Sequence, residues 1–463
     1  MILLLRSTAL VSSLLVGCTG PGPKDDTSPG DSDSAAADTS PDDTAEDTAP
    51  IATVAFSDVT VTADADVPTI LTVTWTTDPA TRGSVAFGET TAYGGSSATE
   101  AEASTAHSVV VRGLAAGTTW HLRPEGNGEG GPDQVWTTTA APAALPTLSV
   151  AGDPAALGGY LVLPINGATY AVAIVDGLGR YVWWHEAEDG YIVTRAVLSN
   201  DGASVIYAQV GTEDYGPDGH LVRVPLDGGE PTVLDVPYLT HDFVELPDGT
   251  LACLTKDLRD NYVGDRIVEY APDGTSSVVW SAFDYFDPTA FEIDESDETW
   301  THANALDYDP IEDAWYISLR NFDTILKADR ASRRLLWRLG EGANFRYEGG
   351  AAPTHRQHQF EVLPDGGLLV FDNGAEAESS SRVVEYTLDE AGGTVTEAWS
   401  YVATPPLYVY ALGDVDRIEE DRTIVTWSTA GLVQIVEADG SELWRLGVEL
   451  GHVFGYTERV TTF

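Results

Sequence analysis

The sequence predicts an all-β protein in which a six-bladed β-propeller follows a small β-sandwich. The first observation is compositional: Gly occurs 45 times and Trp 12 times, whereas only three lysines are present, which favours strands and turns over helices. The second is a series of short alternating strands between residues 51 and 140. The third is a repeat of roughly 45 to 60 residues that recurs six times between residues 148 and 463.

The charge balance excludes one broad class of function. The 463 residues include 73 acidic and 24 basic side chains, giving a formal net charge of -49. A chain this acidic is repelled by phosphate backbones, so no nucleic-acid partner is expected. With 43% hydrophobic residues, the chain can still bury substantial cores.

The N-terminal segment predicts export and a lipid anchor. A largely apolar, uncharged run over residues 7–17 is too short to span a bilayer but suits a signal peptide. It ends in Leu15-Val16-Gly17-Cys18, which resembles the lipobox of bacterial lipoproteins. The resemblance implies that residues 1–18 are a signal peptide and that Cys18 is lipidated. The protein would then be anchored in the bacterial cell envelope, on the periplasmic or cell-surface side of the outer membrane. The alternative is a plain signal peptide with an incidental cysteine.

The only other cysteine is Cys253, which lies in the apolar run Leu251-Ala252-Cys253-Leu254. With Cys18 acylated it has no disulfide partner, so we expect it in the core. Residues 19–50 contain nine acids and one lysine among Pro, Gly, Ser, Thr and Ala. Such a composition cannot bury enough apolar surface to fold, so this segment is expected to be a disordered acidic tether.

Residues 51–140 show the alternation of a sandwich, for example over residues 71–75 and 108–111. The segment from His107 to Arg123 resembles a fibronectin type III-like domain at the corner before its penultimate strand. No cluster of reactive groups is apparent here, and His107 and His121 are expected to be strand residues on a packed or solvated face. A spacer or docking role is the expectation for this domain.

Each repeat of the propeller segment is centred on a hairpin turn and ends in an aromatic strand. The predicted turns are Asn166-Gly167, Asp201-Gly202, Asp248-Gly249, Asp309 to Asp313, Asp365-Gly366 and Glu420-Asp421. The aromatic strands carry Trp183-Trp184, Trp280, Trp337, Trp399 and Trp444, and the second repeat has residues 233–236 in their place. Six units with about four strands each indicate a six-bladed propeller.

Hairpin geometry places three histidines at one repeat position. Counting outward from each turn puts His241, His302 and His358 at the start of the first strand of three consecutive units. First strands line the channel of a propeller, so these side chains should converge on its axis. The expected cross-strand neighbours are Lys256, Arg320 and Asn373, with Ser428 at the equivalent position of the last unit. A register slip of one residue would substitute Thr255 or Asp372.

These residue types favour an anionic substrate. Arg320 offers a planar fork of donors for an oxyanion, Asn304 and Asn373 offer neutral donors, and a histidine can act as nucleophile or proton carrier. Three histidines could also chelate a divalent metal. The cations expected beside them, Arg320 and Lys256, argue against it, so no metal is expected.

The same segments carry a family resemblance. The runs THDFVELPDGTL from Thr240, THANALDYDPIEDAWYISLR from Thr301 and QHQFEVLPDGGLLVFDNG from Gln357 resemble the bacterial arylsulfotransferases, or arylsulfate sulfotransferases. The sharpest match is His302-x-Asn304 with Arg320 eighteen residues beyond the histidine.

The resemblance implies a six-bladed propeller enzyme without a cofactor. It would move a sulfuryl group from an aryl sulfate ester to a phenolic acceptor through a sulfohistidine, by ping-pong kinetics and without a nucleotide sulfate donor. By motif, His358 would be the nucleophile, and His302, Asn304 and Arg320 would bind the sulfuryl oxygens. The neutral imidazole of His358 needs a partner that holds its tautomer, and Asp372 or Asn373 is expected to do so. His241 would assist proton transfer, and Ser428 or Thr429 would match the family's hydroxyl residue near the last blade.

Two other functions remain open from the sequence. One is a lipid-anchored propeller that captures an anion or a glycan without turnover, which binding of aryl sulfates without phenol release would support. The other is a metal-dependent lyase or hydrolase that uses the three histidines, which loss of activity on chelation would support.

Overall fold

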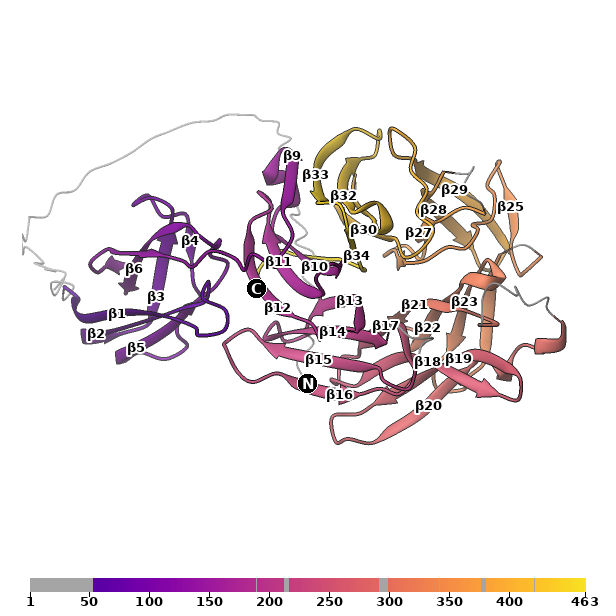
Figure 1. The fold of residues 1–463 in the computed structure, drawn as a ribbon, viewed down its shortest axis with the longest axis horizontal. Coiled ribbons are helices and arrows are strands. Elements are labelled where there is room, and N and C mark those ends of the chain that lie inside the picture. Colours follow the sequence, from indigo (N-terminus) through magenta and orange to yellow (C-terminus); the bar gives the residue numbers. More distant parts are fainter. Residues whose placement is uncertain are drawn as a thin grey trace, which may run out of the picture. The chain divides into compact units, whose positions relative to one another are not determined.

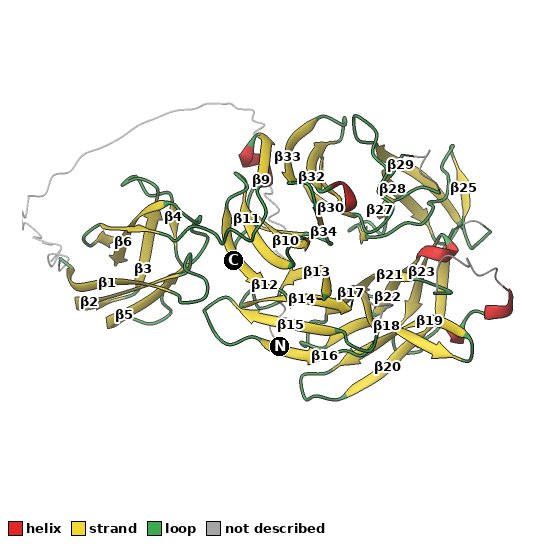
Figure 2. Ribbon diagram, viewed as in Figure 1, coloured by secondary structure: helices red, strands yellow, loops and turns green. Residues whose placement is uncertain are grey.

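The computed structural model describes residues 53–463, except residues 189, 212–215, 291–298, 341, 376–379 and 420. Strands dominate the described chain, which contains short 3-10 helices and no α-helix (Figure 2). The predicted all-β class is therefore confirmed. The predicted signal peptide, Cys18 and the acidic tether lie outside the described residues. Within the described part, no helix has the length and apolar character that crossing a membrane requires.

The N-terminal part of the described chain forms two small antiparallel sheets (Figure 1). One has the order β1-β2-β5, formed by β1 (Ala55–Ala63), β2 (Leu71–Thr81) and β5 (Ser104–Val111). The other has the order β4-β3-β6-β7 with β8 also on β6, formed by β3 (Gly83–Gly88), β4 (Gly95–Ser96), β6 (Thr119–Gly126), β7 (Glu129–Gly130) and β8 (Gln134–Thr137). Alternate residues of β2 are buried, including Leu71, Val73 and Trp75, as expected of a sandwich face. The closer likeness to fibronectin type III domains stays a prediction.

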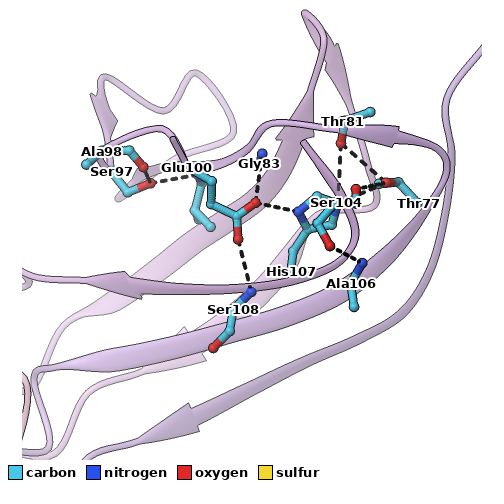
Figure 3. A network of polar contacts seen from close by, with 11 residues as sticks. Thr77, Thr81, Gly83, Ser97, Ala98, Glu100, Ser104, Ala106, His107 and Ser108 are labelled. Atoms are coloured by element: carbon cyan, nitrogen blue, oxygen red, sulfur yellow. Dashed lines mark hydrogen bonds and ion pairs between the residues drawn. The ribbon is translucent and has the colours of Figure 1, made fainter. Parts of the chain in front are cut away.

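A buried polar network fixes this sandwich around His107 (Figure 3). The Nδ1 of His107 lies 2.6 Å from Glu100 Oε2, and its Nε2 lies 2.9 Å from Thr77 Oγ1. Glu100 also accepts a hydrogen bond from the amide of Gly83, and the His107 ring stacks on Trp75 with centroids 4.7 Å apart. His107 is thus a packed structural residue of a strand, as the sequence analysis expected.

The rest of the described chain forms six sheets that are the blades of a propeller, and their strands pair antiparallel except for β25, which runs parallel to β29 (Figure 1). Blades two to four are β13 (Tyr191–Leu198) to β16 (Thr232–Asp235), β17 (Leu239–Glu245) to β20 (Ser276–Ser281), and β21 (Ala303–Asp309) to β24 (Leu335–Leu339). Their middle strands are β14 (Ser204–Gly211), β15 (His220–Pro225), β18 (Leu251–Arg259), β19 (Tyr262–Tyr270), β22 (Ala314–Leu319) and β23 (Thr324–Asp329).

The fifth and sixth blades each carry an additional outer strand, β25 (Arg346–Glu348) and β9 (Leu148–Gly152). Blade five is β26 (Phe360–Val362), β27 (Leu368–Asp372), β28 (Arg382–Asp389) and β29 (Thr394–Tyr401). Blade six is β30 (Asp414–Glu419), β31 (Arg422–Trp427), β32 (Leu432–Glu437) and β33 (Glu442–Val448). The predicted six-bladed propeller is confirmed.

The first blade corrects one sequence prediction. It contains β10 (Tyr160–Gly167), β11 (Ala171–Asp176) and β12 (Tyr181–Glu186), and β10 pairs on its other edge with the C-terminal strands β34 (His452–Phe454) and β35 (Glu458–Val460). Asn166-Gly167 is therefore the end of a second strand and not a turn next to the channel. The Asn166 side chain instead exchanges two hydrogen bonds with the backbone of Val193 in the next blade.

The aromatic strands of the repeat are the fourth strands of the blades, and each holds a bulge beside its tryptophan. Opposite Ile174, Ile267, Lys327, Glu385 and Ile435, the pairing skips one residue immediately before the tryptophan. In blade two, which lacks the tryptophan, β15 and β16 pair without a skip. A bulge increases local twist, which suits the outer edge of a blade. Cys253 is fully buried, as predicted, and burial raises the pKa of its thiol.

Candidate active site

The structure brings His241, His302 and His358 together where three consecutive inner strands begin. His241 lies on β17, His302 immediately precedes β21, and His358 lies two residues before β26. The ring centroid of His241 is 5.0 Å from that of His302 and 6.2 Å from that of His358. His241 and His358 are buried, and His302 is half-buried. We call these three residues the histidine cluster.

Bulges in the inner strands explain the arrangement of the histidine cluster. Leu239 pairs with Thr255 and Phe243 with Cys253, so β17 has two residues more than its partner over this stretch. In β21, Asn304 is the single additional residue. A bulge lets consecutive side chains face the same side, which the regular register assumed for the sequence does not allow. His241 is therefore not directly opposite Lys256, whose amide instead bonds Tyr238 O.

The register of β26 also differs by one residue from the prediction. The Leu363 and Gly367 backbones close a three-residue loop in which Gly366 has φ 84°, a tight turn with a glycine bulge. Beyond β26, the amide of His358 bonds Phe371 O, and the Asp372 carboxylate binds Arg382 and the amide of His355.

Hydrogen bonding sets the tautomer of His358. Its Nδ1 lies 2.8 Å from Asn373 Oδ1 and 3.2 Å from Arg356 O. The Asn373 amide cannot be reversed without loss, because its Nδ2 donates to Val409 O at 2.8 Å and to Leu412 O at 2.9 Å. Since both neighbours of Nδ1 are acceptor oxygens, Nδ1 carries the proton and Nε2 carries the lone pair. His358 thus has the tautomer of a nucleophile at Nε2.

Asn373 therefore does not have the substrate-binding role that was expected of it. Both of its N–H groups are committed to the loop before β30, and its oxygen is committed to His358. It orients the imidazole and has no donor left for a substrate.

Arg320 faces His302 as predicted. The amide of Arg320 donates to His302 O, and its Nη1 donates to Asn321 Oδ1 at 2.8 Å. Asn321 in turn donates to Thr299 O, and the Thr299 hydroxyl lies 3.1 Å from His302 Nδ1. His302 itself has φ 50°, a left-handed conformation that is uncommon for a residue with a side chain and that clusters at functional sites.

Asn304 is fully buried beside the cluster. One N–H of its amide donates to Gln357 O at 2.7 Å, which fixes the residue before His358. The second hydrogen on the same nitrogen remains for a ligand. Asn304 Oδ1 has no hydrogen-bond partner among the described residues.

Two further predicted residues have structural partners. Lys256 is buried, and its Nζ lies 3.3 Å from Asp265 Oδ1. The Asp265 carboxylate therefore balances the charge of this ammonium group, which was expected to bind a ligand. Ser428 is buried one blade further on, where its Oγ accepts the amide of Gly413 at 3.0 Å. Ser428 is therefore the neighbour of Gly413, as its repeat position predicts.

Burial and neighbouring positive charge keep His241 and His358 neutral. Burial is the main cause that lowers the pKa of His358 to about 3, with further lowering by His302 and Arg320 and an opposing effect of the Asn373 hydrogen bond. Burial likewise holds the pKa of His241 well below its ordinary value, reinforced by His302, His358, Lys256 and Arg320. At neutral pH, both imidazoles are uncharged and the nearby guanidinium supplies the positive charge.

Sequence reasoning missed the residues that bind the inner strands to one another beneath the cluster. Asp242 is buried, accepts hydrogen bonds from Leu306 N and Gln359 Nε2, and pairs with Arg195 Nε at 3.3 Å. It thereby connects blades two to five. The sequence does contain a signal for these residues, because a polar residue directly follows both His241 and His358. In a regular strand, that polar side chain would face away from the channel.

The structural role of Gln357, which directly precedes His358, was also missed. Its Nε2 lies within hydrogen-bond distance of Ser318 Oγ, Leu319 O and Thr324 O. These bonds join the segment that carries His358 to the strand that leads into Arg320.

Among the residues that the structure describes, no group of three His, Cys, Asp or Glu side chains is arranged to hold a metal ion. The histidine cluster together with Arg320 suits an anion with a transferable centre.

The comparison with protein families shows to which family the chain belongs. The model of the family described as "Arylsulfotransferase (ASST)" matches residues 157–445. The chain belongs to the arylsulfotransferase family. The match covers most of the propeller and every residue of the histidine cluster, and it supports a sulfotransferase enzyme that acts on aryl sulfates and phenols in general. The resemblance found in the sequence is thus confirmed for the propeller segment.

Solved structures similar to this arylsulfotransferase have low sequence identity. TolB from Acinetobacter baumannii is 13% identical with a TM-score of 0.41, covering 74% of this chain and 79% of TolB. The β-propeller domain of Cps50 (Swd1) from Myceliophteria thermophila is 14% identical with a TM-score of 0.39, covering 67% of this chain and 95% of that domain. No curated protein matches the chain.

Proposed function

We propose that this arylsulfotransferase moves a sulfuryl group from an aryl sulfate ester to a phenolic acceptor by way of a sulfohistidine at His358. The observation that carries the proposal is the hydrogen bond between His358 Nδ1 and Asn373 Oδ1, which leaves the lone pair on Nε2. A neutral imidazole in this tautomer is a competent nucleophile at neutral pH.

In the first half-reaction, the Nε2 lone pair forms a bond to sulfur while the bond between sulfur and the aryl oxygen breaks. The electron pair leaves with the oxygen, and the phenolate takes up a proton. The Nδ1 proton stays on the ring, so the sulfated imidazole is cationic and Asn373 Oδ1 and Arg356 O stabilise its N–H.

In the second half-reaction, the oxygen of the acceptor phenol attacks sulfur and loses its proton, and the bond between Nε2 and sulfur breaks. The imidazole returns to its starting tautomer. Donor and acceptor use one site in turn, so ping-pong kinetics follow.

The remaining residues have the roles of charge stabilisation and proton transfer. A sulfuryl transfer, like a phosphoryl transfer, places charge on oxygens around the transferred centre, so positioned cationic donors provide much of the catalysis. We assign charge stabilisation to Arg320 and His302, which are joined by the hydrogen bond from Arg320 N to His302 O, and to the second N–H of Asn304 as a neutral donor. The departing phenolate takes its proton from solvent. His241, whose burial keeps it neutral, is the base that we assign to accept the proton of the acceptor phenol, which it then returns to solvent.

We also propose that the protein is exported and anchored to the bacterial cell envelope through lipid on Cys18. This proposal is supported by the apolar run and the lipobox-like residues of the sequence alone.

The test is 4-nitrophenol release from 4-nitrophenyl sulfate by the purified full chain, with and without phenol. We expect phenol-dependent release with parallel lines in double-reciprocal plots, and loss of release in His358→Asn. The matched control is His220→Asn, since His220 lies on β15 of blade two outside the histidine cluster, where it bonds Tyr191 of β13 and Asp235 of β16. Turnover retained by a folded His358→Asn protein would refute the nucleophile, and aryl sulfate binding without any release would favour the non-catalytic propeller.

A further inference from the structure

A buried ion pair lies directly behind the histidine cluster. Lys256 of β18 and Asp265 of β19 are cross-strand partners, and Lys256 Nζ is 3.3 Å from Asp265 Oδ1. The two side chains are 2% and 0% exposed. Removing both charges from water costs more free energy than a single contact of this length returns, so such a pair is weak evidence for stability and calls for another role.

The second oxygen of Asp265 shows what the pair does. Asp265 Oδ2 accepts a hydrogen bond from Thr301 Oγ1 at 2.6 Å and another from the amide of Ala303 at 2.7 Å. These two residues flank His302 on either side. One carboxylate of blade three therefore fixes the backbone of blade four immediately before and after a residue of the cluster.

The conformation of His302 explains why such fixing is needed. Its φ of 50° lies in the left-handed region, which is unfavourable for a residue with a side chain. A residue keeps such a conformation only where its surroundings impose it. The two hydrogen bonds of Asp265 Oδ2 hold the residues on both sides of His302 and so restrain its backbone.

Lys256 balances the negative charge of the Asp265 carboxylate. An unbalanced carboxylate beside the cluster would draw protons onto the imidazoles, whereas the ammonium of Lys256 opposes this. The charged and titratable groups around His241 are His302, His358, Lys256 and Arg320, with the Asp242 carboxylate adjacent in sequence.

We infer that Asp265 is a positioning residue that holds His302 in its left-handed conformation, and that Lys256 supplies the counter-charge that keeps this carboxylate from altering the histidine cluster. The structural part stands on the contacts above, and only its catalytic consequence rests on the proposed function.

The first experiment needs no substrate. The imidazole carbons of the full chain are labelled with carbon-13, and the ring signals of His241 and His302 are assigned by their absence in His241→Gln and His302→Gln and followed through a pH titration. In Lys256→Met, which leaves an uncompensated carboxylate, we expect the imidazole pKa of His241 to rise by about one unit. In Lys256→Met/Asp265→Asn, which removes both charges, the pKa returns towards the wild-type value and the His302 signal moves because its backbone is released.

Lys327→Met is the matched control. Lys327 is equally buried and pairs with Glu312 and Glu390, but it lies on β23 away from the cluster. We expect it to leave the signals of the histidine cluster in place. If Lys327→Met moves them as much as Lys256→Met does, or if the His302 signal is unchanged in the double variant, the inference is overturned. The double variant also keeps the test informative if Asp265→Asn alone does not fold.

The second experiment measures sulfuryl transfer in the same proteins. In the double variant, His302 is no longer held in its left-handed conformation, so kcat should fall by about tenfold with little change in the KM of the donor. The reason is that the His302 imidazole stabilises the transition state only when it is correctly placed. An unchanged kcat would overturn the positioning role. A wild-type chain without turnover would instead contradict the proposed function, and the titration would still decide the role of Asp265.

Discussion

Replacing Asn373 with leucine tests the assignment of the nucleophilic tautomer. Leucine has nearly the same shape but cannot accept the His358 Nδ1–H, nor can it donate to Val409 O and Leu412 O. Of the two acceptors at Nδ1, the closer one at 2.8 Å disappears and Arg356 O at 3.2 Å remains.

The size of the effect follows from these contacts. Losing a buried hydrogen bond while its partner stays behind costs about 1–3 kcal/mol. In the sulfated intermediate the imidazole is cationic, so this bond is stronger in the reaction than in the resting enzyme. We therefore expect kcat/KM to fall by roughly 10- to 100-fold, at about 1.4 kcal/mol for each factor of ten.

The assay is phenol-dependent release of 4-nitrophenol, with unfolding by urea measured on the same preparations. Asn166→Leu is the control, because Asn166 is also buried and also makes two hydrogen bonds to the backbone of a neighbouring blade. Both variants should lose stability, but only Asn373→Leu should lose turnover beyond the fraction that is unfolded. Equal kcat/KM in folded Asn373→Leu and wild type would refute the tautomer argument.

Four further outcomes are expected. Because burial holds the pKa of His358 near 3, kcat/KM should stay nearly flat from pH 7 down to about pH 5; a midpoint near 6.5 would contradict a neutral buried nucleophile. The unfolded chain binds protons below about pH 6.5 that the native His358 does not, so the free energy of unfolding should decrease as pH falls from there towards 3, measured by urea titration. Gly413→Ala should destabilise by about 2–4 kcal/mol, since an added Cβ would lie 2.2 Å from the Phe371 ring, whereas Gly274→Ala, with open space around it, should cost only about 1 kcal/mol. Cys18→Ala should shift the protein from the membrane fraction to the soluble fraction of producing cells, and unchanged fractionation would contradict the lipid anchor.

Repetition made the fold predictable from the sequence. The tryptophans of the outer strands and the turns of the inner hairpins recur at similar spacing, so the number of blades follows from counting. The closing strands β34 and β35 escaped prediction because they pair with β10, about 290 residues away in sequence. Local turn chemistry contains no information on such a long-range pairing, and Asn166-Gly167 imitates a turn while serving as a contact between blades.

The sequence predicted which residues form the site better than it predicted how they are arranged. Three equivalent histidines were enough to bring His241, His302 and His358 together, because a position error of one residue along an inner strand still leaves a side chain near the channel. Asn373 was expected either to bind substrate or to hold the tautomer of His358, and its hydrogen bonds fit the second role. The partner of Lys256 was missed because it lies on the next strand outward, in the regular pairing of β18 with β19. Asp242 and Asp265 escaped for a related reason, because each acts through bonds to neighbouring blades.

The most direct test of the central claim is a single turnover without acceptor. The full chain is mixed with an excess of 4-nitrophenyl sulfate in the absence of phenol, the 4-nitrophenol released is counted against protein, and the protein is digested for mass analysis under conditions that preserve sulfohistidine. We predict a burst equal to one 4-nitrophenol per active site and one sulfuryl group on the peptide that contains His358, removed on addition of phenol. A sulfuryl group found on another residue, or steady transfer with no sulfated peptide at all, would contradict the account.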